Sequence, residues 1–228
     1  MSAHAWFRSL VTGRPDLYRT IYDWNVYPHR WLLPAWMDGG SLPEPVVKLL
    51  ESSPAGRERL GRHYRRALGL EEMVWDFQSE ARRLALLGAP TLDRLARFAG
   101  AAVEAHRLAR VIAKEERRAL TERIGDDAYG FALRRGRLLT TSGVHGTDAA
   151  LTAAALGAEV LRAGWATVSA CLGREPEALR RRLRLKAPRD QALFAAEPPT
   201  AEAAAEAWRL LKLITSDVLT LEEARCFA

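Results

Sequence analysis

Cysteine is scarce in this chain, which has only Cys171 and Cys226 among its 228 residues. Two cysteines are too few for the disulfide framework of a small secreted scaffold. A chain of this length buries enough surface to fold without such bridges. A reducing compartment such as the cytoplasm is therefore the expected setting.

Long apolar runs are also missing. The segment that comes nearest to a membrane span is 149–172, and it carries Glu159 and Arg162 near its centre. A charged residue at that depth costs about 2.5–3.5 kcal/mol on insertion scales. The first ten residues contain no apolar core of the kind found in secretory signals,. These absences predict a soluble protein with neither a membrane span nor a secretory signal.

Motifs for catalysis and for cofactor or metal binding are absent as well. Gly39-Gly40 lacks the spacing and the following lysine of a phosphate-binding loop, and residues 142–146 lack the frame of a nucleophile turn,. The five histidines are dispersed, whereas a metal site needs several converging ligands. Adjacent carboxylates such as Asp126-Asp127 point about 100° apart on a helix. The sequence therefore predicts no catalytic residue, no cofactor and no metal site.

What the chain has in excess is arginine. Basic residues number 34 against 28 acidic ones, and only four of the 34 are lysine. Guanidinium groups favour planar, bidentate contacts with carboxylates and phosphates. Composition does not decide between these partners, and a genome-wide preference for arginine and alanine codons would produce the same balance.

Helical periodicity runs through almost the whole chain and predicts an all-α fold, a single multi-helix globular domain. One central helix is expected from a cap at Thr91 to about Ala113, and another over 148–172 after a cap at Thr147, because both are apolar around a wide arc. Gly164 is small enough to let a neighbouring helix approach closely. A short strand is conceivable only at 136–146.

The N-terminal part has a different character. Residues 1–52 form an aromatic, proline-rich segment, and residues 53–228 form the all-helical body on which it is expected to pack. Pro28, Pro34, Pro43 and Pro45 exclude long regular structure over residues 25–45,. The two parts together are interpreted as one domain overall.

The first candidate for partner binding lies in this segment, at Trp24, Tyr27, Trp31 and Trp36, with His29 among them. Neighbouring prolines preset the backbone, so these rings can be displayed with little loss of entropy. Trp, Tyr and Arg also dominate the energetics of protein interfaces. The alternative is that the rings fill the helical core.

The second candidate is a basic helix with leucines for anchoring at 179 and 183. Its cations are Arg180, Arg181, Arg182, Arg184 and Lys186. Such a helix suits phosphates, anionic lipid headgroups or an acidic protein partner. A second arginine group, at 57, 59, 62, 65 and 66, is spread over most sides of its helix, which indicates a solvated surface. No recognised nucleic-acid-binding motif accompanies either group.

The run WNVYPHRWLLP at 24–34 resembles the N-terminal signature of a bacterial family, the K component of the type III secretion sorting platform (SctK/YscK, with OrgA and MxiK). The family pattern is aromatic-Asn-aliphatic-x-Pro, then an aromatic residue, then His-Pro. Here Trp31 stands where Tyr is usual, and Leu33 where His is often found. Residues 83–88 and 92–112 are similar to the family's next segment, and the resemblance spans most of the chain.

This resemblance implies an adaptor without enzymatic activity, located in the bacterial cytoplasm beneath the injectisome at the inner membrane. It would join the forkhead-associated-like cytoplasmic domain of the inner-ring protein SctD to the pod protein SctQ, and so indirectly to the ATPase and its stator.

Our hypothesis is that the aromatic segment and the basic helix contact two different partners. The residues expected to contribute are Trp24, Tyr27, His29, Trp31, Trp36, Arg180, Arg181 and Arg184. The alternative function is an arginine-rich helical protein that binds nucleic acid or an anionic surface.

Overall fold

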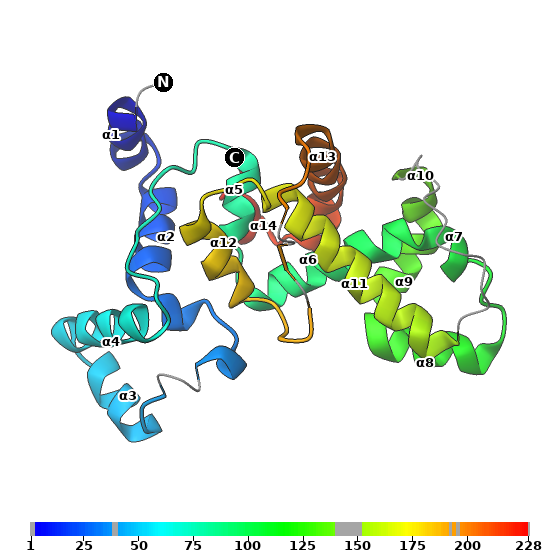
Figure 1. Ribbon diagram of the computed structural model, residues 1–228, viewed down its shortest axis with the longest axis horizontal. Coiled ribbons are helices and arrows are strands. Elements are labelled where there is room, and N and C mark those ends of the chain that lie inside the picture. Colours follow the sequence, from blue (N-terminus) through cyan, green and yellow to red (C-terminus); the bar gives the residue numbers. More distant parts are fainter. Residues whose placement is uncertain (1–2, 38–40, 140–151, 192, 195–196, 228) are drawn as a thin grey trace. The chain divides into compact units, whose positions relative to one another are not determined.

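The computed structural model describes residues 3–37, 41–139, 152–191, 193–194 and 197–227, and every regular element in these ranges is helical (Figure 1). The prediction of an all-α fold is confirmed. None of the helices in the described ranges is both long and apolar enough to cross a membrane.

The helices group into two compact units. The first unit comprises Met1–Ala89, Glu175–Asp190 and Leu221–Ala228, and the second comprises Pro90–Arg174 and Gln191–Thr220. The sequence-based boundary between residues 52 and 53 falls inside the first unit. Segments that are far apart in the sequence therefore share one core in each unit.

Proline positions explain much of the first unit's local structure. Pro15 and Pro54 stand at the first turns of their helices, where the missing N–H costs no hydrogen bond,. Pro28 and Pro34 each begin a single 3-10 turn, so the proline-rich segment is built of short turns. The elements of this unit are α1 (Ala3–Gly13), α2 (Pro15–Val26), η1 (Pro28–Arg30), η2 (Pro34–Trp36), α3 (Glu44–Glu51), α4 (Pro54–Ala67), α5 (Glu80–Arg83), η4 (Leu84–Leu86), α12 (Glu177–Arg184) and α14 (Leu221–Ala224).

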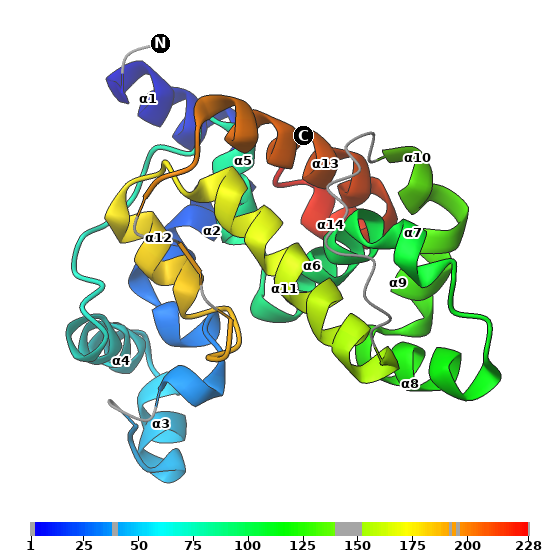
Figure 2. The same ribbon diagram turned by 45° about the vertical axis from the view of Figure 1, so that its right-hand side comes forward.

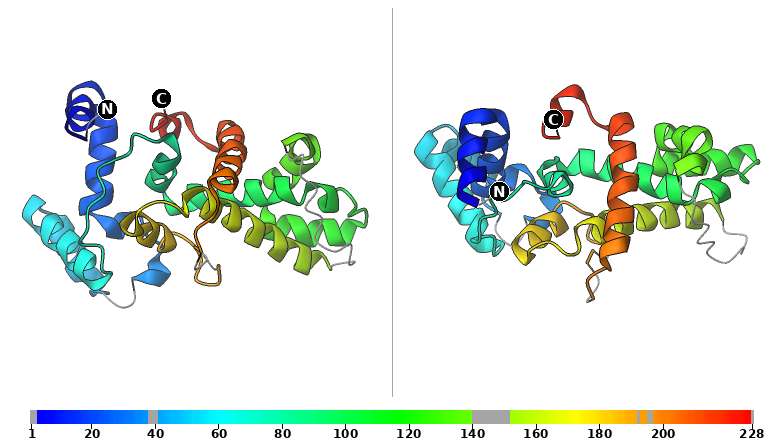
Figure 3. Two further views of the ribbon diagram at one scale, coloured as in Figure 1. Left: turned by 45° about the horizontal axis from the view of Figure 1, so that its top comes forward. Right: turned by 90° about the horizontal axis from the view of Figure 1, so that it is seen from above.

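The second unit is organised around two helices that cross at glycines. Its elements are α6 (Ala89–Val103), α7 (Ala105–Leu108), α8 (Lys114–Ile124), α9 (Asp126–Phe131), the π-turn η5 (Ala132–Gly136), α10 (Arg137–Leu139), α11 (Ala153–Leu172) and α13 (Ala201–Val218). Figure 3 shows α11 running beside α8 and across α6. A Cβ atom on Gly100 of α6 would lie 1.8 Å from the Val160 carbonyl oxygen, and one on Gly164 of α11 would lie 1.8 Å from the Ala96 carbonyl oxygen. The expected close approach at Gly164 is confirmed.

Two predicted helices have wrong boundaries. α6 begins at Ala89, so Thr91 lies inside its first turn, and the helix stops at Val103 rather than continuing to about 113. Pro90 fits the first turn because that position needs no N–H donor. α11 begins at Ala153, where the Thr152 hydroxyl accepts a hydrogen bond from Ala155 N. The predicted cap Thr147 and most of the possible strand lie outside the described residues.

The crossing of α6 and α11 leads to a stability prediction for Gly164→Ala. The added methyl group would meet a helix backbone, which cannot move aside as a side chain does, so we expect unfolding to become easier by about 2 kcal/mol. That loss corresponds to a Tm lower by about 4–8 °C in a chain of this size. Gly13→Ala is the matched control, because a Cβ there has no atom within 4 Å. Equal Tm values for the two variants would contradict the close crossing.

Candidate partner-binding site

The aromatic segment and the basic helix lie together in the first unit. The Arg182 guanidinium sits 4.9 Å from the Trp24 ring centroid, and both side chains are about 1% exposed. Trp24 also packs edge-on against Phe77 at 5.4 Å. Figure 2 shows α12 alongside α2, the helix that carries Trp24. One ring and one cation of the two candidate constellations are therefore parts of the same core.

Two cations of the basic segment are buried. Arg182 Nη2 donates to the carbonyl oxygens of Leu70 at 2.7 Å and Glu72 at 3.0 Å. Lys186 Nζ donates to those of Ala85 at 2.6 Å and Leu87 at 2.7 Å. Both cations are thus stabilised by hydrogen bonds to backbone carbonyl groups rather than by an ion pair with a carboxylate.

Indole rings complete the surroundings of these cations. Lys186 Nζ lies 5.0 Å from the Trp31 ring centroid and 6.0 Å from that of Trp24, distances at which a ring face attracts a cation. Burial lowers the pKa of Lys186 well below its usual value, and the charge of Arg182 adds to this effect. Burial, with a smaller contribution from Arg65, lowers the pKa of Arg182 to about 10.

The remaining aromatic residues of the candidate set are only half-buried. Trp36 Nε1 donates to the Ala187 carbonyl at 2.8 Å, and the Arg189 guanidinium lies 5.0 Å from the Trp36 ring centroid. Tyr27 lies under the guanidinium of Arg30 at 5.0 Å. These contacts hold the proline-rich segment on the first unit while leaving part of each ring at the surface.

The three arginines of the candidate set on α12 have partners within the first unit. Arg180 and Arg184 both pair with Glu177, at 2.8 and 2.9 Å. Arg181, which is exposed, donates to the Gly69 carbonyl at 2.8 Å. Exposed ion pairs are worth about 0–1 kcal/mol, so a partner carboxylate can replace Glu177 at little cost.

His29 is also largely buried. Its side chain is 7% exposed, stacks on Tyr64 at 5.2 Å, and places Nε2 3.7 Å from Glu51 Oε1. Neither ring nitrogen has a hydrogen-bond partner in the described part of the chain. Burial, helped by the positive charge of Arg30, lowers its pKa to about 4. His29 is therefore neutral at physiological pH.

The sequence analysis did not single out Asn25, although the fold depends on it. Its Nδ2 donates to the carbonyls of Ile21 at 3.0 Å and Val74 at 2.8 Å, and its Oδ1 accepts from Val74 N at 2.9 Å. The extended segment 70–78, which we call the connecting segment, obtains further bonds from side chains. Trp6 Nε1 donates to the Trp75 carbonyl, and Arg83 Nε donates to that of Phe77. A lone asparagine within an apolar run was the available signal.

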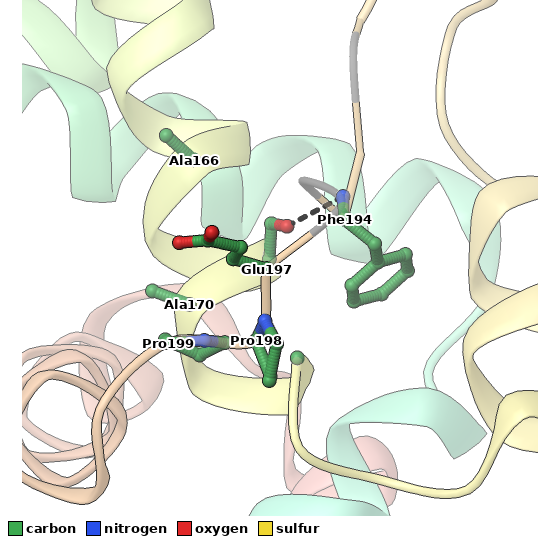
Figure 4. A pocket seen from close by; sticks show the side chains of 8 residues that line it. Ala166, Ala170, Phe194, Glu197, Pro198 and Pro199 are labelled. Carbon is green, nitrogen blue, oxygen red and sulfur yellow. Dashed lines mark hydrogen bonds between the residues drawn. The ribbon is translucent and has the colours of Figure 1, made fainter.

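Two hollows of the second unit bring few reactive groups together. One, of about 300 Å³, lies between α11 and the residues Phe194, Glu197, Pro198 and Pro199 (Figure 4). The Phe194 N–H, which donates to Ser169 Oγ at 2.7 Å, lies at its edge, and Glu197 is the only ionisable residue in the lining.

A second hollow of about 290 Å³ in the same unit contains two arginines, and each is paired with an aspartate: Arg94 with Asp127 and Arg97 with Asp93. Among the described residues, no three His, Cys, Asp or Glu side chains converge as a metal site would require.

Comparison with known proteins gives one match. A family model described as YOP proteins translocation protein K (YscK) matches residues 18–227, which is nearly the whole chain and includes every residue of the candidate set. No curated protein and no solved structure shows a significant match.

The burial of His29 predicts a pH-dependent stability. Its pKa is about 4 in the folded chain and about 6.5 when unfolded,. Between these pH values the unfolded state therefore binds more protons than the folded state. The contribution of neutral His29 to the free energy of unfolding is complete above pH 6.5 and is lost as the pH falls toward 4. Between pH 7 and pH 5, denaturant titrations should show a loss of about 2 kcal/mol from this group. His29→Phe, which retains a ring over Tyr64, should lack that loss, whereas exposed His63→Phe should retain it. Equal pH profiles for the two variants would refute the assignment.

The contacts of Asn25 predict a large loss of stability for Asn25→Leu. Leucine has a similar volume but leaves the buried N–H and C=O of Val74 without partners, which should cost about 3 kcal/mol. Denaturant titration measures the total effect, and hydrogen exchange should accelerate across residues 70–78. Thr20→Ala on the same helix loses only a hydrogen bond to Asp16 in its own helix and should change stability by less than about 0.5 kcal/mol. Unchanged exchange in Asn25→Leu would show that the connecting segment is held by other contacts.

Proposed function

Since the chain belongs to the YscK family of type III secretion proteins, we propose that it is a non-enzymatic adaptor of the injectisome sorting platform. In this role it links the cytoplasmic domain of the inner-ring protein SctD to the pod protein SctQ. It acts in the bacterial cytoplasm, at the inner-membrane face, and meets the ATPase and its stator only through the pods.

The observation that carries this proposal is the family match over residues 18–227. Two features of the structure support it. The two hollows described in the second unit contain isolated or mutually paired charges rather than a nucleophile beside a base, and such a convergence is what an active site requires. Both cysteines are free thiols, as expected for a protein of a reducing compartment.

One partner surface is assigned to α12. Arg182 and the leucines of this helix face the core, while Arg180, Arg181 and Arg184 remain at least partly exposed. An acidic partner that replaces Glu177 as their counter-charge gains bidentate contacts. The half-buried rings of Tyr27, Trp31 and Trp36 are proposed to contribute to contact with the other partner.

Affinity capture from the native cell tests the function, and a triple variant of α12 tests the surface. Wild-type protein should retain SctD and SctQ. Arg180→Ala, Arg181→Ala and Arg184→Ala together should weaken binding to one of them at least about tenfold, as hot-spot residues do, with a Tm close to that of the wild type. A triple alanine variant at the exposed Arg59, Arg110 and Arg209 removes the same charge and is the matched control.

Three outcomes are informative. Unchanged binding of the α12 variant to both partners would refute the surface, and capture of neither ring nor pod protein by the wild type would refute the function. Tight retention of duplex DNA, with an affinity that falls by a slope of about −0.9 per phosphate against log salt, would favour the alternative of nucleic-acid binding.

A further inference from the structure

A ladder of aromatic rings lies on the first unit, outside the basic helix. Neighbouring ring centroids are 6.0 Å apart for Phe7 and Trp75, 6.4 Å for Trp75 and Tyr18, 6.4 Å for Tyr18 and Tyr22, and 6.3 Å for Tyr22 and Tyr27. Phe7 is 42% exposed and Tyr22 is 39% exposed. We call these five residues the aromatic ladder. Tyr18, Trp75 and Tyr27 are half-buried. The ladder therefore presents part of its ring surface to solvent, and exposed apolar patches of this kind mark interaction sites.

The ladder is built on rigid supports. Phe7 comes from α1, Tyr18 and Tyr22 are one turn apart on α2, and Trp75 belongs to the connecting segment. Asn25 and Trp6 fix that segment through hydrogen bonds to Val74 and Trp75. Rings held in this way lose little further entropy when a partner binds.

Three arginines form a second feature. Arg62, Arg65 and Arg66 stand at i, i+3 and i+4 on α4 and therefore share one face of the helix,. With Glu71 and Met73 they line a hollow of about 200 Å³. We call this the arginine hollow. Burial, and to a smaller extent the charge of Arg62, lowers the pKa of Arg65.

The ladder and the hollow adjoin. Met73, which lines the hollow, is 39% exposed and lies two residues before Trp75, so the two share a side of the extended connecting segment,. The intervening Val74 is buried. Arg65 Nη1 donates to the Val26 carbonyl at 2.6 Å, and Val26 is one helical turn from Tyr22 on α2. The left view of Figure 3 shows α2 between α1 and α4 in the first unit, and α2 contacts both of these helices.

From this juxtaposition we propose that the aromatic ladder and the arginine hollow together bind an acidic segment of a protein partner. Carboxylates of the segment enter the hollow, and an apolar side chain beside them packs on the exposed rings. Each guanidinium has five N–H donors, so the existing pairs of Arg62 with Glu58 and Arg66 with Glu71 leave further donors for the partner. Tyr, Trp and Arg are also the residue types enriched at interface hot spots.

The ring geometry favours a peptide over single-stranded nucleic acid. Phe7 meets both Tyr18 and Trp75 edge-on, at 84° and 82°, and Tyr22 meets Tyr27 at 74°. Bases of a bound strand stack on successive open ring faces, but in these pairs one ring edge covers the face of its neighbour. Apolar side chains have no such requirement.

This proposal rests on the proposed function only because it requires a protein partner. The test uses the full chain and a defined peptide probe. The probe is a short capped peptide of glutamate and aspartate containing two leucines. A control peptide has glutamine and asparagine in place of the acids. Calorimetry at physiological salt should show at least about tenfold tighter binding of the acidic peptide, a difference typical of charge-assisted pairs.

Variants then locate the site. Arg62→Gln with Arg66→Gln should weaken acidic-peptide binding at least about tenfold, whereas Arg110→Gln with Arg209→Gln, which removes the same charge from the exposed surface of the second unit, should weaken it less than about threefold,. Tyr22→Ala removes a ring but no charge and should weaken binding by about threefold or more. If the double variant has a lower Tm than the wild type, the single Arg66→Gln variant provides the same comparison with less disturbance, because Arg66 is exposed.

Equal weakening by the two double variants would overturn the proposal, because net charge alone would then explain binding. Failure of the wild type to bind the acidic peptide would also overturn it, as would tighter binding of an oligo-dT strand with the same sensitivity to Arg62 and Tyr22. None of these results depends on capture of SctD or SctQ, so failure of this surface is distinguishable from failure of the proposed function.

Discussion

The first unit depends on two cations that are buried without a carboxylate among the described residues. Arg182 and Lys186 are solvated instead by four backbone carbonyls and two indole rings. A buried charge is tolerated only where donors and acceptors surround it. The carbonyls belong to residues 70–87, about a hundred positions earlier in the chain. The two cations therefore attach residues 175–190 to a core formed mainly by the first 89 residues.

That arrangement decides which side chains are left for a partner. Trp24 is used to cover Arg182, so it belongs to the core, which was the alternative left open for the aromatic segment. With Arg182 and the leucines of α12 turned to the core, Arg180 and Arg184 lie on the outer side of the helix, where both pair with Glu177. On the same unit, Asn25 and the buried cations fix the connecting segment, and that segment carries Trp75 and Met73 to the surface. The buried polar contacts are thus the reason that the exposed rings and guanidinium groups have fixed positions.

Sequence reasoning predicted the helical fold and the family, and both are confirmed, because periodicity and a local motif are properties of short segments. It did not predict which cations are buried, since burial depends on residues a hundred positions away. A partial signal existed nonetheless. The spacing of three and four residues places Leu179, Arg182, Leu183 and Lys186 on one helical face,. The two cations are therefore on the same face as the anchor leucines. The assignment of surfaces to partners stays a prediction.

The structure separates the arginines of α4, which the sequence analysis treated as one scattered group. Arg62, Arg65 and Arg66 line the arginine hollow, whereas Arg59 is exposed and is not among the residues that line it. Arg65 illustrates how one residue serves both structure and surface, because its Nη1 donates to the Val26 carbonyl at 2.6 Å while its guanidinium still lines the hollow. In an arginine-rich chain, the count of charges therefore says little about binding. What matters is whether the N–H donors of each guanidinium are all bonded to backbone carbonyls or neighbouring carboxylates. Only an arginine with some donors not used in this way can donate to a partner.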